Sequence, residues 1–587
     1  MPRGLNEPVI ASIKLYTPLI HAFTLIVRLS DDNWISCPPT RHLILSGKAN
    51  NLYGMTDKIS NAARLQRVYN TATHSIIPFE PLRPGHVGIY VCGATVQSSP
   101  HVGHLRAAVA FDIVRRWLMK LGYEVTFIRN VTDIDDKILD KSAAAGQQWW
   151  QRAYIYEREF THAYELLGVL APTYEPRATG HIPEMIELIQ RLIDRGHAYV
   201  VLNADGTPSG NVYFDVPSWT KYGELTHQES GTQASDATQS QADLDVESAA
   251  PSIDKLGNDK YNPVDAADLS EDKHSPRDFA LWKAPKDTDP LSARWNTPFG
   301  AGRPGWHIEC SAMSHKYLGD DFDIHGGGLD LRFPHHENEV AQSHAAGWGF
   351  AHVWMHSAWV TQKGEKMSKS LGNGLSLENV LVGYNPWMVR FALGSVQYRS
   401  MLEWSDQTLE EAKSAFDRVT GFLERAQDLL DSHDIAMPSS DDIAQIGADE
   451  LPEAFVKAMT DDFNIPGALA SIFSSVREGN SAIADNQPET VVRCVRYIRA
   501  MLDVLGLDPL SEQWAHSING IGSSSSSHMS TEHNILDALV RSQLEARAQA
   551  RNSKDFATAD AIRNSLTAAG ITIEDGPQGS TWKLTRE

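Results

Sequence analysis

The stretch Pro100-His101-Val102-Gly103-His104 stands between a predicted strand and a predicted helix, and it decides the fold. Before it, residues 86–92 alternate and are rich in β-branched side chains, which predicts a strand that ends at Cys92. After it, residues 105–121 carry apolar side chains at helical spacing, and residues 123–130 predict a second strand. Strand, loop, helix and strand form the repeating unit of a parallel, nucleotide-binding α/β sheet.

His101 and His104 fall at the carboxyl end of the first strand, where ligands of such sheets bind. At a helix N-terminus they supply hydrogen-bond donors beside a partial positive charge, which suits the phosphates of ATP. Gly103 carries no side chain, so a nucleotide can approach the backbone closely. Two histidines at a turn are by themselves more often surface or capping residues, so the motif needs a second signal.

A polar stretch further along, Gly364-Glu365-Lys366-Met367-Ser368-Lys369-Ser370, supplies that signal. Two lysines three residues apart, with hydroxyls beside them, suit a loop that closes over a triphosphate and stabilises the charge of the leaving pyrophosphate. Standing alone, the stretch equally describes a solvated basic loop.

A third set of side chains can bind a soft metal. His335 and Glu339 are four residues apart on an expected helix, which places both on one face. Together with Cys92 and Cys310 they form a Cys, Cys, His and carboxylate set that suits zinc. Spacing alone leaves open a plain surface helix, or other ligands on that helix, namely His336, Glu337 and His344.

The first two stretches resemble the HxGH and KMSKS signatures of the class I aminoacyl-tRNA synthetases, in the order that this family uses. Residues 305–313 (GWHIECSAM), 325–331 (HGGGLDL) and 333–339 (FPHHENE) are similar, almost residue for residue, to segments of the cysteinyl-tRNA synthetase family. The resemblance implies a ligase that activates L-cysteine with ATP and Mg²⁺ as cysteinyl-adenylate. It then transfers the cysteine to the 3′-terminal ribose of tRNA(Cys).

The resemblance also implies roles for the residues at matching positions. The ATP site contains His101, Gly103, His104, Lys366, Ser368 and Lys369. The catalytic residues among them are His101, His104, Lys366 and Lys369. One Zn²⁺ per chain, which selects the thiolate of cysteine over the hydroxyl of serine, is bound by Cys92, Cys310, His335 and Glu339. The cysteine pocket is walled by Thr132, Trp306, His325 and Asp330.

The C-terminal residues 545–563 and 573–582 resemble the anticodon-reading domain of the same family. They predict tRNA contacts by Arg547, Arg551, Asp575 and Trp582. This end of the chain separates the synthetase from a rival with the same fold and zinc chemistry, the cysteine ligase of mycothiol biosynthesis, which uses an amino-sugar inositol as acceptor. A non-catalytic tRNA-binding paralogue is the other alternative, and the intact motifs argue against it.

The patterning predicts a Rossmann-like parallel-sheet catalytic domain with an inserted connective segment, followed by all-α C-terminal helical domains. The expected segments are a poorly ordered N-terminal extension (1–64), the first half of the catalytic domain with the connective insertion (65–227), an acidic low-complexity insert (228–275), the second half with the zinc ligands and KMSKS loop (276–385), a helical stem and bundle (386–522), a Ser-rich linker (523–533) and an anticodon-binding domain (534–587).

The composition is that of a globular protein with several domains. The 587 residues include only four cysteines, which argues against a disulfide framework, and no apolar run is long enough to cross a membrane. The net charge of −22 is unexpected for a tRNA-binding protein, but residues 228–275 hold eleven Asp or Glu and three Lys, a net of −8. We therefore expect a cytoplasmic monomer that binds tRNA through restricted basic surfaces.

Overall fold

The computed structural model describes residues 26–30, 33–36, 59–227, 270–362, 365–366, 375–381, 384–515 and, with short gaps, 540–584. The chain divides into two compact units, Met1–Met55 and Thr56–Glu587. In the first unit, β1 (Ile26–Ser30) and β2 (Asn33–Ser36) form an antiparallel hairpin within the extension that was expected to be poorly ordered. The rest of that extension up to residue 58, and the acidic insert from 228 to 269, lie outside the described residues.

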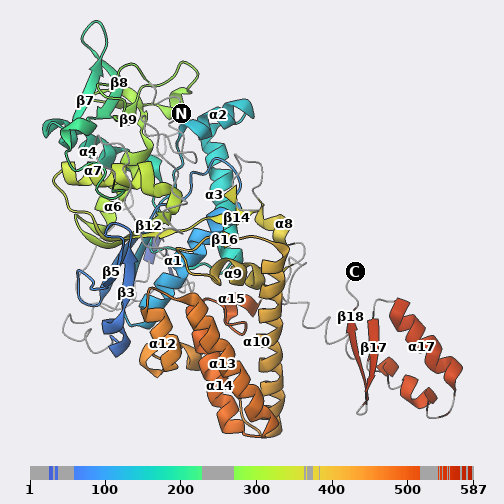
Figure 1. Ribbon diagram of the computed structural model, residues 1–587. Coiled ribbons are helices and arrows are strands. Elements are labelled where there is room, and N and C mark those ends of the chain that lie inside the picture. Colours follow the sequence, from blue (N-terminus) through green and yellow to red (C-terminus); the bar gives the residue numbers. More distant parts are fainter. Residues whose placement is uncertain are drawn as a thin grey trace, which may run out of the picture. The chain divides into compact units, whose positions relative to one another are not determined.

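The core of the second unit is a four-stranded parallel sheet with strand order β13-β12-β5-β6 (Figure 1). The prediction of a strand–helix–strand unit is confirmed, because α1 (Val102–Lys120) connects β5 to β6. This helix begins at Val102, three residues before the predicted start. The bounds of the strands are β5 (His86–Val91), β6 (Glu124–Arg129), β12 (Phe322–Gly328) and β13 (Ala351–Ser357).

Helices cover both faces of this sheet. On one face, a Cβ added to Gly326 would lie 2.3 Å from Phe111 of α1. On the other face, a Cβ added to Gly327 would lie 2.9 Å from His336, which directly precedes α7 (Glu337–Ala345). Helix α6 (Trp306–Leu318) packs against α7 and β5. Because neighbouring residues of a strand point to opposite faces, α1 and the α6–α7 pair lie on opposite sides of the sheet.

An antiparallel sheet with strand order β10-β11-β9-β8-β7 is inserted between β6 and β12. Its strands are β7 (Ala198–Leu202), β8 (Pro208–Phe214), β9 (Phe279–Lys283), β10 (Trp295–Thr297) and β11 (Gly300–Pro304). The sequence predicted only the first two of these strands, so the insertion continues to Pro304. The helices that precede this sheet are α2 (Asp136–Ala144), α3 (Trp149–Leu166) and α4 (Ile182–Asp194).

Helices dominate after residue 385, which confirms the predicted helical region. They are α9 (Pro386–Gly394), α10 (Asp406–Ser432), α11 (Ser440–Ala444), α12 (Glu453–Thr460), α13 (Ile465–Ala484), α14 (Pro488–Val504) and α15 (Glu512–Ala515), after a short α8 (Leu377–Leu381). Two small sheets accompany them: β3 (Arg67–Asn70) with β4 (Ser75–Pro78), and β14 (Val360–Gln362) between β15 (Glu365–Lys366) and β16 (Leu402–Glu403). Among the described helices, none has the length and apolarity to cross a membrane.

The described C-terminal residues form a small module with an apolar cluster of their own, Val540, Leu544, Leu566 and Ile571. Helix α17 (Phe556–Ala568) is followed by an antiparallel hairpin of β17 (Ile571–Gly576) and β18 (Gly579–Leu584). The sequence predicted the helix but not the hairpin.

Candidate active site and metal centre

Residues on β5 and β12 form the floor of the candidate site. Tyr90 of β5 pairs with His325 of β12. Two residues further along each strand, Cys92 and Gly327 point to the same face as these two, and Gly327 pairs with His356 of β13. The missing side chain at Gly327 leaves the space that the segment before α7 occupies above the sheet.

Four donor side chains converge above this floor. Cys92 follows β5, Cys310 lies in α6, His335 lies in the π-helical turn Arg332–His336, and Glu339 lies in the first turn of α7. Their donor atoms all lie within 4.8 Å of one another, and all but Cys92 are buried. Cys92 Sγ is 3.6 Å from Cys310 Sγ and 3.4 Å from Glu339 Oε1. His335 Nε2 is 3.1 Å from the same carboxylate oxygen.

These separations fit a single metal ion. Around a tetrahedral zinc with bonds of about 2.3 Å to sulfur and about 2.1 Å to nitrogen or oxygen, two sulfurs lie about 3.8 Å apart. A sulfur and an oxygen then lie about 3.6 Å apart, and a nitrogen and an oxygen about 3.4 Å. The observed separations are each shorter by only about 0.2–0.3 Å, so the four donors match the coordination of zinc without a large movement.

The protonation states of the donors also favour a cation. Burial lowers the pKa of His335 to about 3, so its imidazole is neutral and offers a lone pair. Burial raises the pKa of the Cys92 thiol well above its ordinary value, and the adjacent Cys310 and Glu339 raise it further. Two thiols and a carboxylate that oppose one another's ionisation become compatible when a dication is bound among them.

A second set of possible donors combines Cys92 and Glu339 with His325 and His336. His336 Nε2 is 4.0 Å from Glu339 Oε1, while its Nδ1 lies 2.8 Å from Nε2 of His356. His325 Nε2 lies 2.9 Å from Oε2 of Glu339, which turns the Oε1 atom toward the other donors. We therefore favour the set with two sulfurs, in which His325 orients the carboxylate.

The other two competitors that the sequence left open have structural roles. Glu337 is buried and accepts hydrogen bonds from the backbone N–H groups of Gly223 and Thr226, and from the Thr226 hydroxyl. His344 Nδ1 lies 3.2 Å from the carbonyl oxygen of Trp348. Neither residue belongs to a possible metal-binding group in the part of the chain that the structure describes.

His335 is held from two sides. Its ring stacks on the ring of Trp306 with centroids 4.2 Å apart, and its Nδ1 lies 3.0 Å from Nδ1 of His307. Burial lowers the pKa of His307 to about 3, so this imidazole is neutral and can accept a proton from its neighbour. When His335 donates through Nδ1–H, its Nε2 lone pair is left for a metal.

Thr132 and Asp330, the other residues predicted to wall the cysteine pocket, flank this centre along the chain. Thr132 is buried, pairs with Thr95 in the loop after Cys92, and donates its hydroxyl to Glu309 Oε2 at 2.9 Å. Burial raises the pKa of Glu309 well above its ordinary value, so this carboxyl group is protonated. Asp330 is half-buried on the turn that follows β12.

The predicted ATP-binding histidines cap helix α1. His101 is the N-cap residue, and its Nδ1 accepts from the backbone N–H of Gly103 at 3.1 Å. His104 Nδ1 accepts in return from the backbone N–H of His101 at 3.3 Å. This reciprocal capping box fixes both rings, with centroids 3.8 Å apart, at the positive end of the helix dipole, where phosphates bind well.

The structure brings the second signature close to the first. The backbone N–H of Val102 donates to the carbonyl oxygen of Leu375, which follows the lysine-rich stretch, at 3.1 Å. Lys366 lies on β15, but its side chain, and the whole of Ser368 and Lys369, are outside the described residues. The described end of this loop is therefore anchored beside the start of α1.

The predicted tRNA contacts all lie on the C-terminal module. Arg551 is exposed, whereas Arg547 is only 5% exposed, so little of the Arg547 side chain can reach a phosphate. Burial thus argues against the predicted role of Arg547. Asp575 and Trp582 lie on the two strands of the hairpin, and their side chains are outside the described part.

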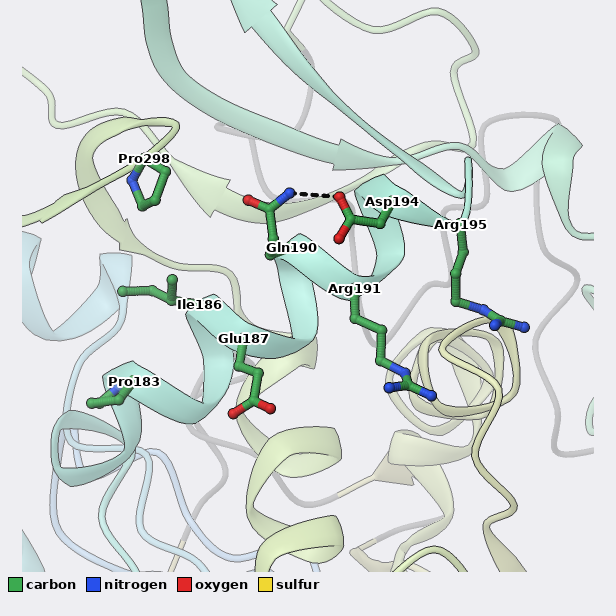
Figure 2. A pocket seen from close by; sticks show the side chains of 8 residues that line it. All are labelled: Pro183, Ile186, Glu187, Gln190, Arg191, Asp194, Arg195 and Pro298. Carbon is green, nitrogen blue, oxygen red and sulfur yellow. Dashed lines mark hydrogen bonds between the residues drawn. The ribbon is translucent and has the colours of Figure 1, made fainter.

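A surface cavity of about 580 Å³ along α4 contains none of the predicted site residues, and its lining includes Pro183, Ile186, Gln190 and Pro298 (Figure 2). Two arginines of α4 that also border the cavity, Arg191 and Arg195, donate through Nε to the carbonyl oxygens of Ala346 and Ala345. These carbonyls end α7, where cations stabilise a helix. The insertion therefore supports the helix that carries Glu339.

Three family models match the chain. They describe a class I (C) tRNA synthetase catalytic domain over residues 78–414, a DALR domain over 454–509 and a cysteinyl-tRNA ligase anticodon binding domain over 534–582. The cysteine–tRNA ligase of Bifidobacterium longum is 64% identical over 534 residues, which cover 90% of this chain and 96% of that relative. The chain belongs to the cysteine–tRNA ligase family.

A second family member, from Beutenbergia cavernae, is 50% identical over 519 residues, which cover 88% of this chain and 99% of its own. Among solved structures, an Agrobacterium radiobacter LeuRS in a ternary complex with tRNA and LeuAMS matches 76% of this chain and 86% of its own. Its identity to this family member is 13% and the TM-score is 0.50, so the two share the fold.

Several residues around the donors were not identified from the sequence: Tyr90, His307, Glu309, His336 as a neighbour of His356, and His356 itself. Two of them had a usable signal. Tyr90 stands two residues before Cys92 on a predicted strand, so both share one face. His307 stands one helical turn before Cys310. The position of His356 depends on the pairing of β12 with β13, which the sequence does not specify.

Proposed function

We propose that this ligase joins L-cysteine to tRNA(Cys) in two steps, with the sulfur of the amino acid held at the Cys92, Cys310, His335 and Glu339 centre. The convergence of these four donors on the sheet that also carries the capped histidines of α1 is the observation that carries this proposal. In the first step, the cysteine carboxylate attacks the α-phosphorus of ATP and pyrophosphate leaves. In the second, the terminal ribose hydroxyl of the tRNA takes the cysteinyl group from the adenylate.

One zinc ion held by the four donors would supply a soft Lewis acid that lowers the pKa of a bound thiol and disfavours the hard hydroxyl of serine. The chain's own side chains orient the ligands. His307 and Trp306 hold the ring of His335, and His325 holds one oxygen of Glu339. Thr132, Trp306, His325 and Asp330 are proposed to form the surroundings of the cysteine.

The proposed ATP site uses the N-terminus of α1 and the lysine-rich loop. His101 and His104 bind phosphate oxygens of ATP with Mg²⁺, and Gly103 leaves room for the nucleotide. The loop residues Lys366, Ser368 and Lys369 close over the triphosphate and stabilise the charge of the leaving pyrophosphate. The hydrogen bond from Val102 to Leu375 supports this pairing, because it ties the two segments together.

The proposed acceptor is tRNA rather than an amino-sugar inositol. The match of residues 534–582 to an anticodon binding domain supports this choice. On that module we propose that Arg551, Asp575 and Trp582 contact the tRNA. We propose further that the enzyme works as a monomer in the cytoplasm, where tRNA and ATP are available.

The decisive test is transfer of radiolabelled cysteine onto unfractionated tRNA, run beside the amino-sugar inositol acceptor. We expect charging of tRNA with cysteine but not with serine. Pyrophosphate exchange alone would not suffice, because both kinds of ligase activate cysteine. Product on the amino sugar with no charged tRNA would overturn the proposal.

The metal assignment has its own test. Cys310→Ser should lower the zinc content, measured by mass spectrometry, and weaken cysteine activation together. Cys494→Ser is a matched control, because Cys494 is also buried but lies in α14, outside the donor set. A Cys310→Ser protein that keeps its zinc and its discrimination against serine would show that the assignment is wrong.

A further inference from the structure

Tyr90 lies directly beneath the metal donors. It is 0% exposed, two residues before Cys92 on β5, and on the same face of the sheet. Its cross-strand partner is His325, whose ring centroid is 5.3 Å away and whose Nε2 contacts Glu339. The phenol is therefore enclosed by the layer that holds the four donors.

The Tyr90 hydroxyl has no hydrogen-bond partner of normal geometry among the residues that the structure describes. A buried hydroxyl without a partner is costly, so such a group is rare in a folded protein unless it serves a bound species. The same strand position could be filled by phenylalanine at no loss of packing. The hydroxyl therefore requires an explanation beyond the fold.

Its surroundings indicate the acceptor. Burial raises the pKa of the Tyr90 phenol, and Cys310 raises it next most strongly, followed by Cys92 and Glu339. The phenol thus keeps its proton and faces sulfur. A neutral thiol is a weak acceptor, whereas a thiolate is a strong one. Metal binding releases the thiol proton to solvent and converts the sulfur into a thiolate.

We propose that Tyr90 is a positioning residue of the metal centre, whose O–H donates a hydrogen bond to Cys310 Sγ when that sulfur is a metal-bound thiolate. This inference rests on the proposed metal site and adds a residue to it. The bond stabilises the thiolate, withdraws electron density from it and fixes its direction. In the metal-free protein the hydroxyl contributes nothing, because its acceptor is protonated.

The test uses the full chain with Co²⁺ in place of zinc, because cobalt gives a thiolate-to-metal absorption band. A hydrogen bond to the sulfur moves that band to higher energy, so Tyr90→Phe should move it to longer wavelength. Cobalt affinity, measured by competition with a chelator, should fall about tenfold, as expected for loss of a charge-assisted hydrogen bond. The metal-free variant should unfold at the same denaturant concentration as the wild type, or at a higher one.

Tyr164→Phe is the control, since Tyr164 is also buried but lies in α3 between Arg129 and Glu175. It should change neither the band nor the affinity. The same band and affinity in wild type and Tyr90→Phe would overturn the Tyr90 proposal and leave the metal site intact. Equal destabilisation of the metal-free and metal-bound variant would also overturn it, in favour of a packing role. A wild-type protein that shows no thiolate band with cobalt would refute the metal site and Tyr90 together.

Discussion

Replacement of Asp136 by Asn removes the centre of a buried ion network that joins the insertion to the catalytic sheet. Asp136 begins α2, close behind Thr132, and is only 3% exposed. Lys286 Nζ lies 2.7 Å from its Oδ1, Lys283 Nζ lies 3.2 Å from its Oδ2, and Arg303 also donates to Oδ1. The three cations come from residues 283–303, far along the chain, so one carboxylate holds the two ends of the insertion together.

Asparagine keeps the shape of this side chain but removes the charge, which leaves the buried cations without their main partner. Breaking a buried ion pair in this way costs about 3–5 kcal/mol. Burial alone would raise the pKa of Asp136, but Lys283, Arg303 and Lys286 outweigh it and hold the pKa below its ordinary value. The unfolded-state pKa is about 3.9, so the stabilisation is complete above about pH 4 and is lost as the pH falls further.

Hydrogen exchange read by mass spectrometry suits this question, because it reports opening of α2 and β9 separately from the rest of a large chain. At pH 7 we expect amides there to exchange at least about 100-fold faster in Asp136→Asn, which corresponds to the lower end of the expected cost. The difference from wild type should stay constant between pH 7 and pH 5.

Asp140→Asn is the control on the same helix. The Asp140 side chain is 67% exposed and lies 3.9 Å from Lys286, so this exposed pair contributes less than about 1 kcal/mol. Similar exchange rates in Asp136→Asn and Asp140→Asn would refute the argument that burial makes the Asp136 network strong.

Three further perturbations address the site and its support. Gly327→Ala would place a Cβ 2.9 Å from His336, so the ring must move, and we expect at least about tenfold weaker zinc binding by chelator competition. Arg390→Met would remove a buried ion pair to Asp112 of 2.6 Å and should lower the free energy of unfolding by about 3–5 kcal/mol in urea titrations. Chelation of zinc should make Cys310 react faster with a thiol reagent, and added zinc should reverse this.

The sequence was sufficient to predict the parallel sheet and the donor set, for two different reasons. Alternation before Cys92 and helical spacing after Leu105 are local signals, and they predicted β5 and α1 to within a few residues. The grouping of Cys92 with Cys310, by contrast, came from resemblance to a family. Spacing alone could not separate His335 from His336, because both lie at the start of the same helix.

Other features depend on contacts between distant segments. Strands β9 to β11 are short, contain glycine and proline, and are specified mainly by their pairing with β8. The burial of Arg547 depends on the tertiary packing of its module, which a charge pattern does not report. The predicted tRNA role of Arg547 failed on that ground, whereas the exposed Arg551 remains a candidate.

The arrangement of the site explains why amino-acid selection and ATP chemistry lie on one structural unit. Cys92 follows β5, and the next helical residue along the chain is Val102, beside His101. The loop between them also pairs with Thr132, so a single segment connects the metal donor, the capped histidines and the wall of the pocket. A change in metal coordination that moves Cys92 must therefore also strain the start of α1. For that reason a substitution at Cys92 should lower the rate of adenylate formation by more than its effect on cysteine binding accounts for.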